Sequence, residues 1–252
     1  MLAAVQNGDA KKVTELIRQD PGFKVNMEVD EYGLTILHDA CRESHRSAVI
    51  PLLLAHPDID VKSKYGNTPF MFACYDRIIS CVREMLKDSR VDVNETDNGG
   101  RTPLWYAARD GYLDVIKWWI ASGREMDLGR PGDIDRTDAI GKAKQNGETE
   151  VVTLLERFKE NPDETRHAVR VELGWYDPAA AEVFALVVFV SDGLLQINST
   201  TPSPAARYFS IAAQLPLELQ MVLCFRQVGL GKEIIPGKDS EVAFKELARR
   251  LW

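Results

Sequence analysis

The chain has 252 residues, of which 45% are hydrophobic and 27% are charged, and its formal net charge at pH 7 is −7. This composition is ordinary for one or two soluble globular domains, and the acidic balance argues against nucleic acid as a partner. The longest apolar run, 183–190, is far shorter than the ~20 residues that a membrane helix needs, so we expect no membrane span.

One sequence pattern occurs three times between residues 30 and 129. Each copy has a glycine, a threonine two residues later and an alanine five residues after that, and successive copies are separated by 33 and then 34 residues. The copies are 33–40 (GLTILHDA), 66–73 (GNTPFMFA) and 100–107 (GRTPLWYA). A period of this length is typical of a solenoid built from stacked two-helix repeats.

Each copy predicts two helices. The first begins at the threonine, since Thr68 and Thr102 can cap a helix and the prolines that follow them have φ preset for its first turn. About eight residues after each alanine, apolar residues at positions i, i+1, i+4 and i+5 predict a second helix with one buried stripe. These second helices are expected over 48–53, 81–86 and 115–120.

The order of these features resembles the ankyrin repeat, whose consensus Gly-x-Thr-Pro-Leu-His-x-Ala is followed by a Val-Val-x-x-Leu-Leu helix and an Asp-Val-Asn hairpin. The resemblance covers about residues 2–158 and gives about five units, of which the first and last are atypical, as terminal repeats often are. It implies an all-α fold, an ankyrin-repeat solenoid with short hairpin turns over 1–160. His38 matches the consensus histidine, which implies a structural hydrogen bond rather than catalysis.

After about residue 160 the repeat period is lost, and Asn161-Pro162 predicts the start of a new helix. We expect five further helices, at approximately 162–173, 178–191, 203–214, 216–228 and 239–251. They predict a helical C-terminal domain over 161–252 that packs on, or caps, the last repeat.

Residues 215–219 (LPLEL) allow a second interpretation of this region. Together with Val222-Leu223 they resemble the opening of an F-box, a helical module that docks on an adaptor of ubiquitin ligases. Two glycine-containing stretches, 229–232 and 236–237, fall where the second and third helices of that module should run, which favours an ordinary proline-started helix.

The resemblance also indicates which surface binds a partner. In an ankyrin stack the hairpin tips and the polar side of the first helix share the concave face, and tyrosine and arginine are enriched at interface hot spots. The residues at these positions, which we call the concave ladder, are Glu31, Tyr32, Lys64, Tyr65 and Asn98 on the tips and Arg42, Glu43, Tyr75, Asp76, Arg109 and Asp110 on the helices. A single position of this kind is more often a solvated surface residue, so the prediction of partner binding rests on the group.

Two places break the repeat pattern. Trp118 occupies a second-helix position that usually faces solvent, and we expect the C-terminal helices to cover it, with an external partner as the alternative. Pro51 lies inside a second helix, which it should bend or delay, and Ile50 beside it is expected at an exposed position.

The four cysteines predict free thiols. Cys41 and Cys74 occupy the same position in successive repeats, where packed helices would set them about 10 Å apart, too far for a disulfide. The first ten residues also lack the charged start and apolar core of a secretory signal. We therefore expect a cytoplasmic or nuclear protein.

No catalytic or metal-binding motif is present in the sequence, and the histidines have no cysteine or carboxylate at metal-ligand spacing. We therefore expect no enzyme activity, no cofactor, no metal and no small-molecule substrate. The first hypothesis is a scaffold that binds one or more proteins through the concave ladder. The alternative is a substrate receptor of a ubiquitin ligase, in which the repeats choose the target and 215–252 recruits the ligase.

Overall fold

The computed structural model describes residues 1–20, 25–56, 62–129, 137–192 and 204–227, together with 239, 242, 243, 245 and 246. The chain divides into two compact units, Met1–Val169 and Arg170–Trp252. In the described ranges the regular elements are helices, and the strand-like pairing among them is an isolated bridge between Glu28 and Thr35.

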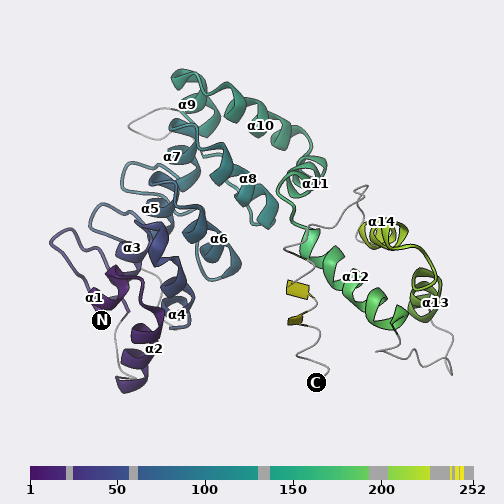
Figure 1. Cartoon of the computed structure of the whole chain (residues 1–252). Helices are drawn as coiled ribbons and strands as arrows, with labels where there is room; N and C mark the ends of the chain where they lie inside the picture. The colour runs from purple at the N-terminus through teal and green to yellow at the C-terminus, as the bar shows by residue number, and fades with distance from the viewer. Residues whose placement is uncertain are drawn as a thin grey trace. The chain divides into compact units, whose positions relative to one another are not determined.

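The first unit is a stack of helix pairs in two layers (Figure 1). The first helices of the pairs are α1 (Leu2–Gln6), α3 (Ile36–Ala40), α5 (Pro69–Tyr75), α7 (Pro103–Arg109) and α9 (Ala139–Asn146). The second helices are α2 (Ala10–Gln19), the 3₁₀ helix η1 (Ser44–Val49) with α4 (Ile50–Leu54), α6 (Ile79–Lys87), α8 (Leu113–Ser122) and α10 (Thr149–Glu160), and α11 (Pro162–Glu172) follows. Within each layer every helix contacts the next one, which confirms the predicted all-α repeat fold.

The first helices begin where the caps predict. The side-chain oxygens of Thr68 and Thr102 each accept a hydrogen bond from a backbone N–H three residues later, both at 3.2 Å, and a proline occupies the first helical turn. Asp138 takes the place of the threonine in the last pair, where its carboxylate accepts from the backbone N–H of Gly141 at 2.6 Å. A short side chain with an acceptor oxygen is what this position needs, and aspartate supplies one.

His38 makes the structural hydrogen bonds that its position implies. Its Nδ1 accepts from the backbone N–H of Thr35 at 3.1 Å, and its Nε2 lies 3.0 Å from the carbonyl oxygen of Asn67 in the next repeat. Because Nδ1 accepts, Nε2 carries the proton and donates it to that carbonyl. Burial lowers the pKa of His38, which keeps the imidazole neutral.

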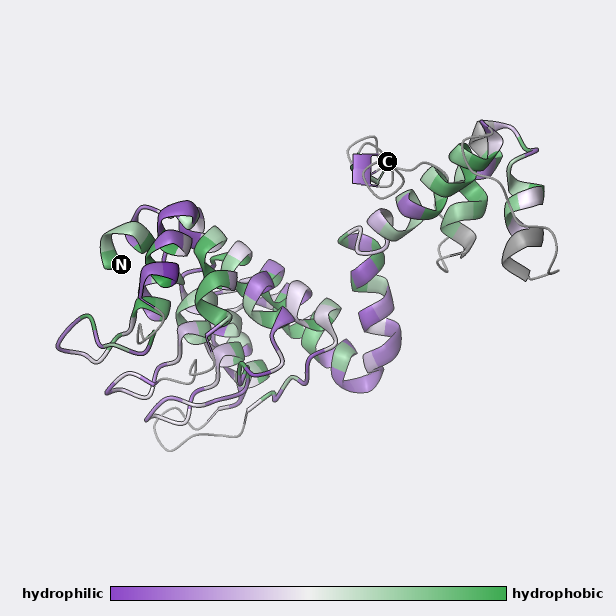
Figure 2. Ribbon diagram, turned by 90° about the horizontal axis from the view of Figure 1, so that it is seen from below, coloured by the Kyte–Doolittle hydropathy of each residue, from purple (hydrophilic) through white to green (hydrophobic). Residues whose placement is uncertain are grey.

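The loops before the first helices are joined to one another through their backbones. The N–H of Lys64 donates to the carbonyl of Tyr32 and the N–H of Asn98 donates to the carbonyl of Tyr65, both at 3.0 Å. Gly66 has a φ of 80°, and a Cβ added there would lie 2.7 Å from the backbone nitrogen of Asn98. Gly66 therefore allows the next tip to approach closely. These loops project from one side of the unit in Figure 1 and also in Figure 2.

The second helices bury the stripes that the sequence predicts. Val82 and Met85 of α6 and Ile116 and Trp119 of α8 are fully or almost fully buried. The ring of Trp119 packs edge-on against Phe70 of α5, with 5.1 Å between ring centroids, so the two layers share one core. Each such side chain contributes about 1.5–3 kcal/mol on burial.

Pro51 delays its helix as expected, but the expected exposure of Ile50 is wrong. The segment from Ser44 to Val49 is a 3₁₀ helix, and α4 begins only at Ile50, with Pro51 in its first turn. A 3₁₀ helix turns about 20° further per residue than an α-helix, so the later residues are rotated relative to the repeat pattern. Ile50 is consequently 0% exposed, whereas Pro51 faces solvent.

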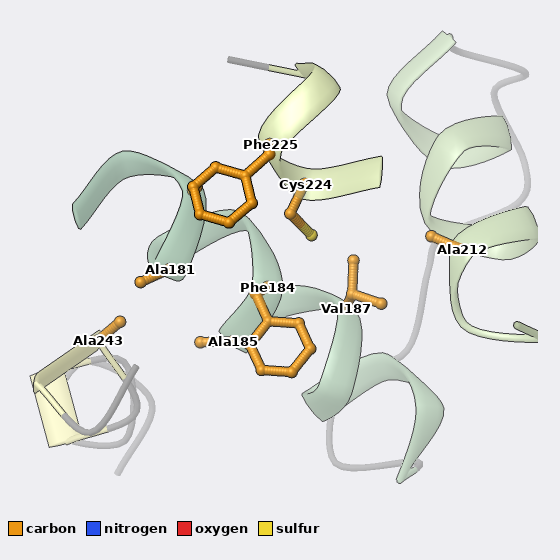
Figure 3. Close-up of a cluster of buried hydrophobic side chains, with 9 residues drawn as sticks. Ala181, Phe184, Ala185, Val187, Ala212, Cys224, Phe225 and Ala243 are labelled. Carbon is orange, nitrogen blue, oxygen red and sulfur yellow. The ribbon is translucent and has the colours of Figure 1, made fainter. Parts of the chain in front are cut away.

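The second unit has helices at the expected places and a core of its own. The expected helices at 178–191, 203–214 and 216–228 correspond to α12 (Asp177–Ser191), α13 (Pro204–Ala212) and α14 (Leu217–Gln227), whereas that at 239–251 falls mostly outside the described residues. Phe184 and Val187 of α12 pack with Cys224 and Phe225 of α14 (Figure 3). The LPLEL stretch forms the loop before α14 and its first turn, where the side-chain amide of Gln220 donates to the carbonyl of Leu215 at 2.9 Å.

Replacing Gly66 with alanine tests the close approach of the tips. Gly66→Ala should lose about 1 kcal/mol from the left-handed φ and about 1–3 kcal/mol more from the contact with Asn98. Gly147→Ala is the matched control, because Gly147 has a φ of 79° but no atom within 4 Å of an added Cβ. Urea unfolding measures both losses of free energy, and equal losses would contradict the close approach.

The buried histidine should make stability depend on pH. Because the pKa of His38 is lower in the folded chain than its ordinary value of 6.5, the unfolded chain takes up the proton first as the pH falls. The stabilisation is therefore complete above about pH 6.5 and is lost below it. Thermal unfolding between neutral and mildly acidic pH should show a smaller loss for His38→Gln than for the wild type. Identical pH profiles for the two proteins would be the contrary result.

Candidate functional site

The tip residues of the concave ladder form one continuous row. The rings of Tyr32 and Tyr65, from successive repeats, lie 6.2 Å apart between centroids and are 48% and 59% exposed. The ammonium group of Lys64 donates to the carbonyl of Glu31 at 2.7 Å, and the side-chain amide of Asn98 donates to the carbonyl of Lys64 at 3.0 Å. The structure thus brings the five tip residues together across three repeats.

Five of the six helix residues of the ladder line two pockets, and the sixth, Asp110, lines neither. Tyr75 and Arg109 lie in the first, which has a volume of about 300 Å³ and which we call the aromatic pocket. Its lining residues are Asn67, Met71, Phe72, Tyr75, Tyr106 and Arg109. Tyr75 of α5 and Tyr106 of α7 meet edge-on with 5.7 Å between centroids, so the walls come from neighbouring repeats.

Arg109 forms one wall of the aromatic pocket with its charge already paired. Its guanidinium donates two hydrogen bonds to the carboxylate of Asp110, at 2.7 and 2.6 Å, and the pairing raises the pKa of Arg109. Its guanidinium carbon also lies 5.2 Å from the ring centroids of both Tyr75 and Tyr106. Cation–π contact and ion pairing hold the planar group in place.

Tyr106 is fixed by the hairpin loop beside it. Its hydroxyl donates to the carboxylate of Asp97 at 2.6 Å, and the other oxygen of that carboxylate accepts from the backbone N–H groups of Gly99 and Arg101. Burial, and then the hydrogen bond to Asp97, raise the pKa of Tyr106. The hydroxyl is therefore neutral and engaged, and the ring is what remains to contact a ligand.

The second pocket, which we call the charged pocket, has a volume of about 510 Å³ and holds three of the predicted residues, Arg42, Glu43 and Asp76. Its lining residues are Asp39, Arg42, Glu43, Arg46, Asp76 and Ile78. Arg46 is already paired, since it donates to the Asp39 carboxylate at 3.0 Å and also to the backbone carbonyls of Gln6 and Asp39. Burial raises the pKa of Asp76; the nearby Arg42 opposes this shift, and the charge of Glu43 adds a smaller upward contribution.

Sequence reasoning missed the helix position that precedes each recurring alanine. Phe72 and Tyr106 occupy this position in successive repeats, and both line the aromatic pocket. They lie three residues before Tyr75 and Arg109, on the same helix face. Aligning the three copies and applying the i, i+3 rule to the predicted first helices would have found them.

Trp118 has a neighbour within the first unit. The guanidinium carbon of Arg83, on α6, lies 4.1 Å from the centroid of the Trp118 ring, and the tryptophan is partly buried. The sequence also predicts that the C-terminal helices cover Trp118. Such a contact would lie between the two units, and it stays a prediction.

Cys41, Cys74, Cys81 and Cys224 are all buried as free thiols. No group of histidine, cysteine, aspartate and glutamate in the described ranges could hold a metal ion. Among the same residues, no helix combines the length and hydropathy that crossing a bilayer requires.

Three known proteins show what the repeats are similar to. A family model described as "Ankyrin repeats (3 copies)" matches residues 45–130. Over 100 residues, 38% of this chain and 9% of the relative, the chain is 38% identical to the human transient receptor potential cation channel subfamily A member 1. It is 29% identical over 113 residues to an ankyrin repeat protein of variola virus, covering 42% of this chain and 20% of the relative. It is 33% identical over 119 residues to an ankyrin repeat-containing protein of Schizosaccharomyces pombe, covering 46% of this chain and 50% of the relative. The chain thus spans half the length or less of each of these relatives.

Proposed function

We propose that this chain, in which residues 45–130 are ankyrin repeats, binds a partner protein through the concave ladder and the two pockets beside it. Ankyrin repeats are protein–protein interaction modules, and repeat families of this kind bind through an extended concave surface. The proposal assigns the chain a scaffolding role without catalysis.

The observation that carries the proposal is the exposure of three tyrosines in two successive repeats. Tyr32, Tyr65 and Tyr75 are 48%, 59% and 45% exposed, although the transfer of a tyrosine ring out of water is favourable. A partner that covers them buries apolar area at little entropic cost, since a tyrosine has few rotatable bonds.

The rigidity of the surface supports the same proposal. Backbone hydrogen bonds join the tips, and the pairing of Arg109 with Asp110 holds one pocket wall. A surface that is ordered before binding loses less conformational entropy when the partner arrives, so more of the contact energy is available as affinity.

The test is crosslinking of the full chain to its partner, followed by substitution of the three tyrosines. A photo-crosslinking amino acid at Asn98 should capture the partner, and replacing Tyr32, Tyr65 and Tyr75 with alanine should reduce capture at least about tenfold. Arg83→Ala on α6 is the control, since it removes an exposed side chain from a second helix and should leave capture unchanged. Equal capture by the triple variant and the wild type would rule out this face.

The alternative function, a receptor of a ubiquitin ligase, draws support from the start of α14. The helix begins directly after Pro216, and Leu219 in its first turns is 49% exposed. If this segment docks on a ligase adaptor, Leu219→Asp in the full chain should abolish co-purification with that adaptor, whereas Tyr65→Ala should not. Failure of the wild-type chain to bind any ligase adaptor would remove the alternative.

We also propose a reducing location, the cytoplasm or nucleus, and a C-terminal helical domain, which the sequence predicts over 161–252 and whose compact part is Arg170–Trp252. The four free, buried thiols support the first proposal. The buried cluster around Phe184 and Phe225 supports the second, since it gives those helices a core of their own.

A further inference from the structure

We infer that the segment of the partner bound on the concave face is an extended peptide with a basic residue two or three positions from a large apolar residue. This inference rests on the function proposed above and names the chemistry of the partner. The basic side chain occupies the charged pocket, and the apolar side chain occupies the aromatic pocket.

The aromatic pocket is built for an uncharged occupant. Its one charged side chain, Arg109, is paired through two hydrogen bonds with Asp110, and the Tyr106 hydroxyl is committed to Asp97. The surfaces that remain are the rings of Phe72, Tyr75 and Tyr106, the flat side of the guanidinium, and the side chains of Met71 and Asn67. A volume of about 300 Å³ is at the small end of ligand pockets, which suits a single large side chain.

The charged pocket has an excess of negative charge. It holds three carboxylates and two guanidinium groups, and Arg46 is already engaged with Asp39 and backbone carbonyls. Within the described part of the chain, neither Glu43 nor Asp76 has an ion-pair partner within 4 Å. A cation from outside would therefore relieve the repulsion between these two carboxylates.

Burial leaves the charged form of Asp76 only partly compensated. Its pKa is raised mainly by burial; Arg42 lowers it, and the charge of Glu43 raises it by less than Arg42 lowers it. Arg42 also lies over the ring of Phe72, with its guanidinium carbon 6.0 Å from the centroid, so it is shared with the aromatic pocket. A lysine or arginine of the partner supplies the missing positive charge.

The spacing of the two residues follows from the position of the pockets. Tyr75 and Asp76 are neighbours at the end of α5, and they line the aromatic and the charged pocket respectively. Adjacent packed helices lie about 8–10 Å apart, and an extended peptide rises about 3.3 Å per residue. A peptide that crosses the first helices therefore places its two anchors two or three residues apart.

Selection from a displayed library of random linear peptides on the full chain tests the inference. The selected peptides should share a lysine or arginine two or three positions from a phenylalanine, tryptophan, leucine or methionine. Their binding should fall about 30-fold or more with Tyr75→Ala, since buried aromatic residues are the typical hot spots.

A double-mutant cycle between the basic residue of one selected peptide and the carboxylates of the charged pocket then tests the basic anchor. Replacing its basic residue with norleucine should weaken binding to the wild type about threefold to tenfold, the range of a partly exposed ion pair. The same replacement should change binding to Asp76→Asn and to Glu43→Gln by much less, because these variants already lack one carboxylate. Glu160→Gln on α10 is the matched control and should respond like the wild type.

Each outcome separates this inference from the function on which it rests. The inference would be overturned if the selected peptides depend on Tyr75 but share no basic residue. It would also be overturned if the double-mutant cycle shows no coupling between the basic residue and Asp76 or Glu43. Either result would leave the concave-face function in place. Selected peptides whose binding is indifferent to Tyr32, Tyr65 and Tyr75 would overturn both. A shared basic–apolar pair with coupling to Asp76 or Glu43 would support both.

Discussion

The close packing of successive first helices is the constraint on which the rest of this structure depends. Ala40, Ala73, Ala107 and Ala143 occupy the same position in α3, α5, α7 and α9, and all four are 0% exposed. A small side chain there lets neighbouring helices approach closely, so residues one repeat apart meet on the concave side. The pairing of Tyr75 with Tyr106 depends on that distance.

Because of the same stacking, the residues that stabilise the fold differ from those that are proposed to recognise a partner. The buried stripes of the second helices, such as Val82 and Ile116, hold the layers together, while the exposed ends of the first helices and the tips make few contacts with the core. Side chains on the concave side can therefore differ from repeat to repeat without changing the fold. In this chain they give one pocket lined by aromatic rings and one lined mainly by charged groups.

The sequence predicts much of the fold because local signals set it. Thr68 and Thr102 fix the helix starts, and the apolar stripes fix the buried faces. Ile50 was the exception, because a local change from α to 3₁₀ geometry rotated the chain, and no repeat pattern encodes that rotation. The pockets were only half predicted, since they form between repeats: Tyr75 and Arg109 were found, but Phe72 and Tyr106 were not.

Amide hydrogen exchange of the full chain, with and without its bound partner, tests the account most directly. If the concave side is the binding surface, exchange should slow at the tips around Tyr32, Tyr65 and Asn98 and at the C-terminal ends of α3, α5 and α7. The outer helices α6 and α8 should exchange at unchanged rates. Protection confined to those outer helices or to the second unit, with unchanged exchange at the tips, would contradict the account.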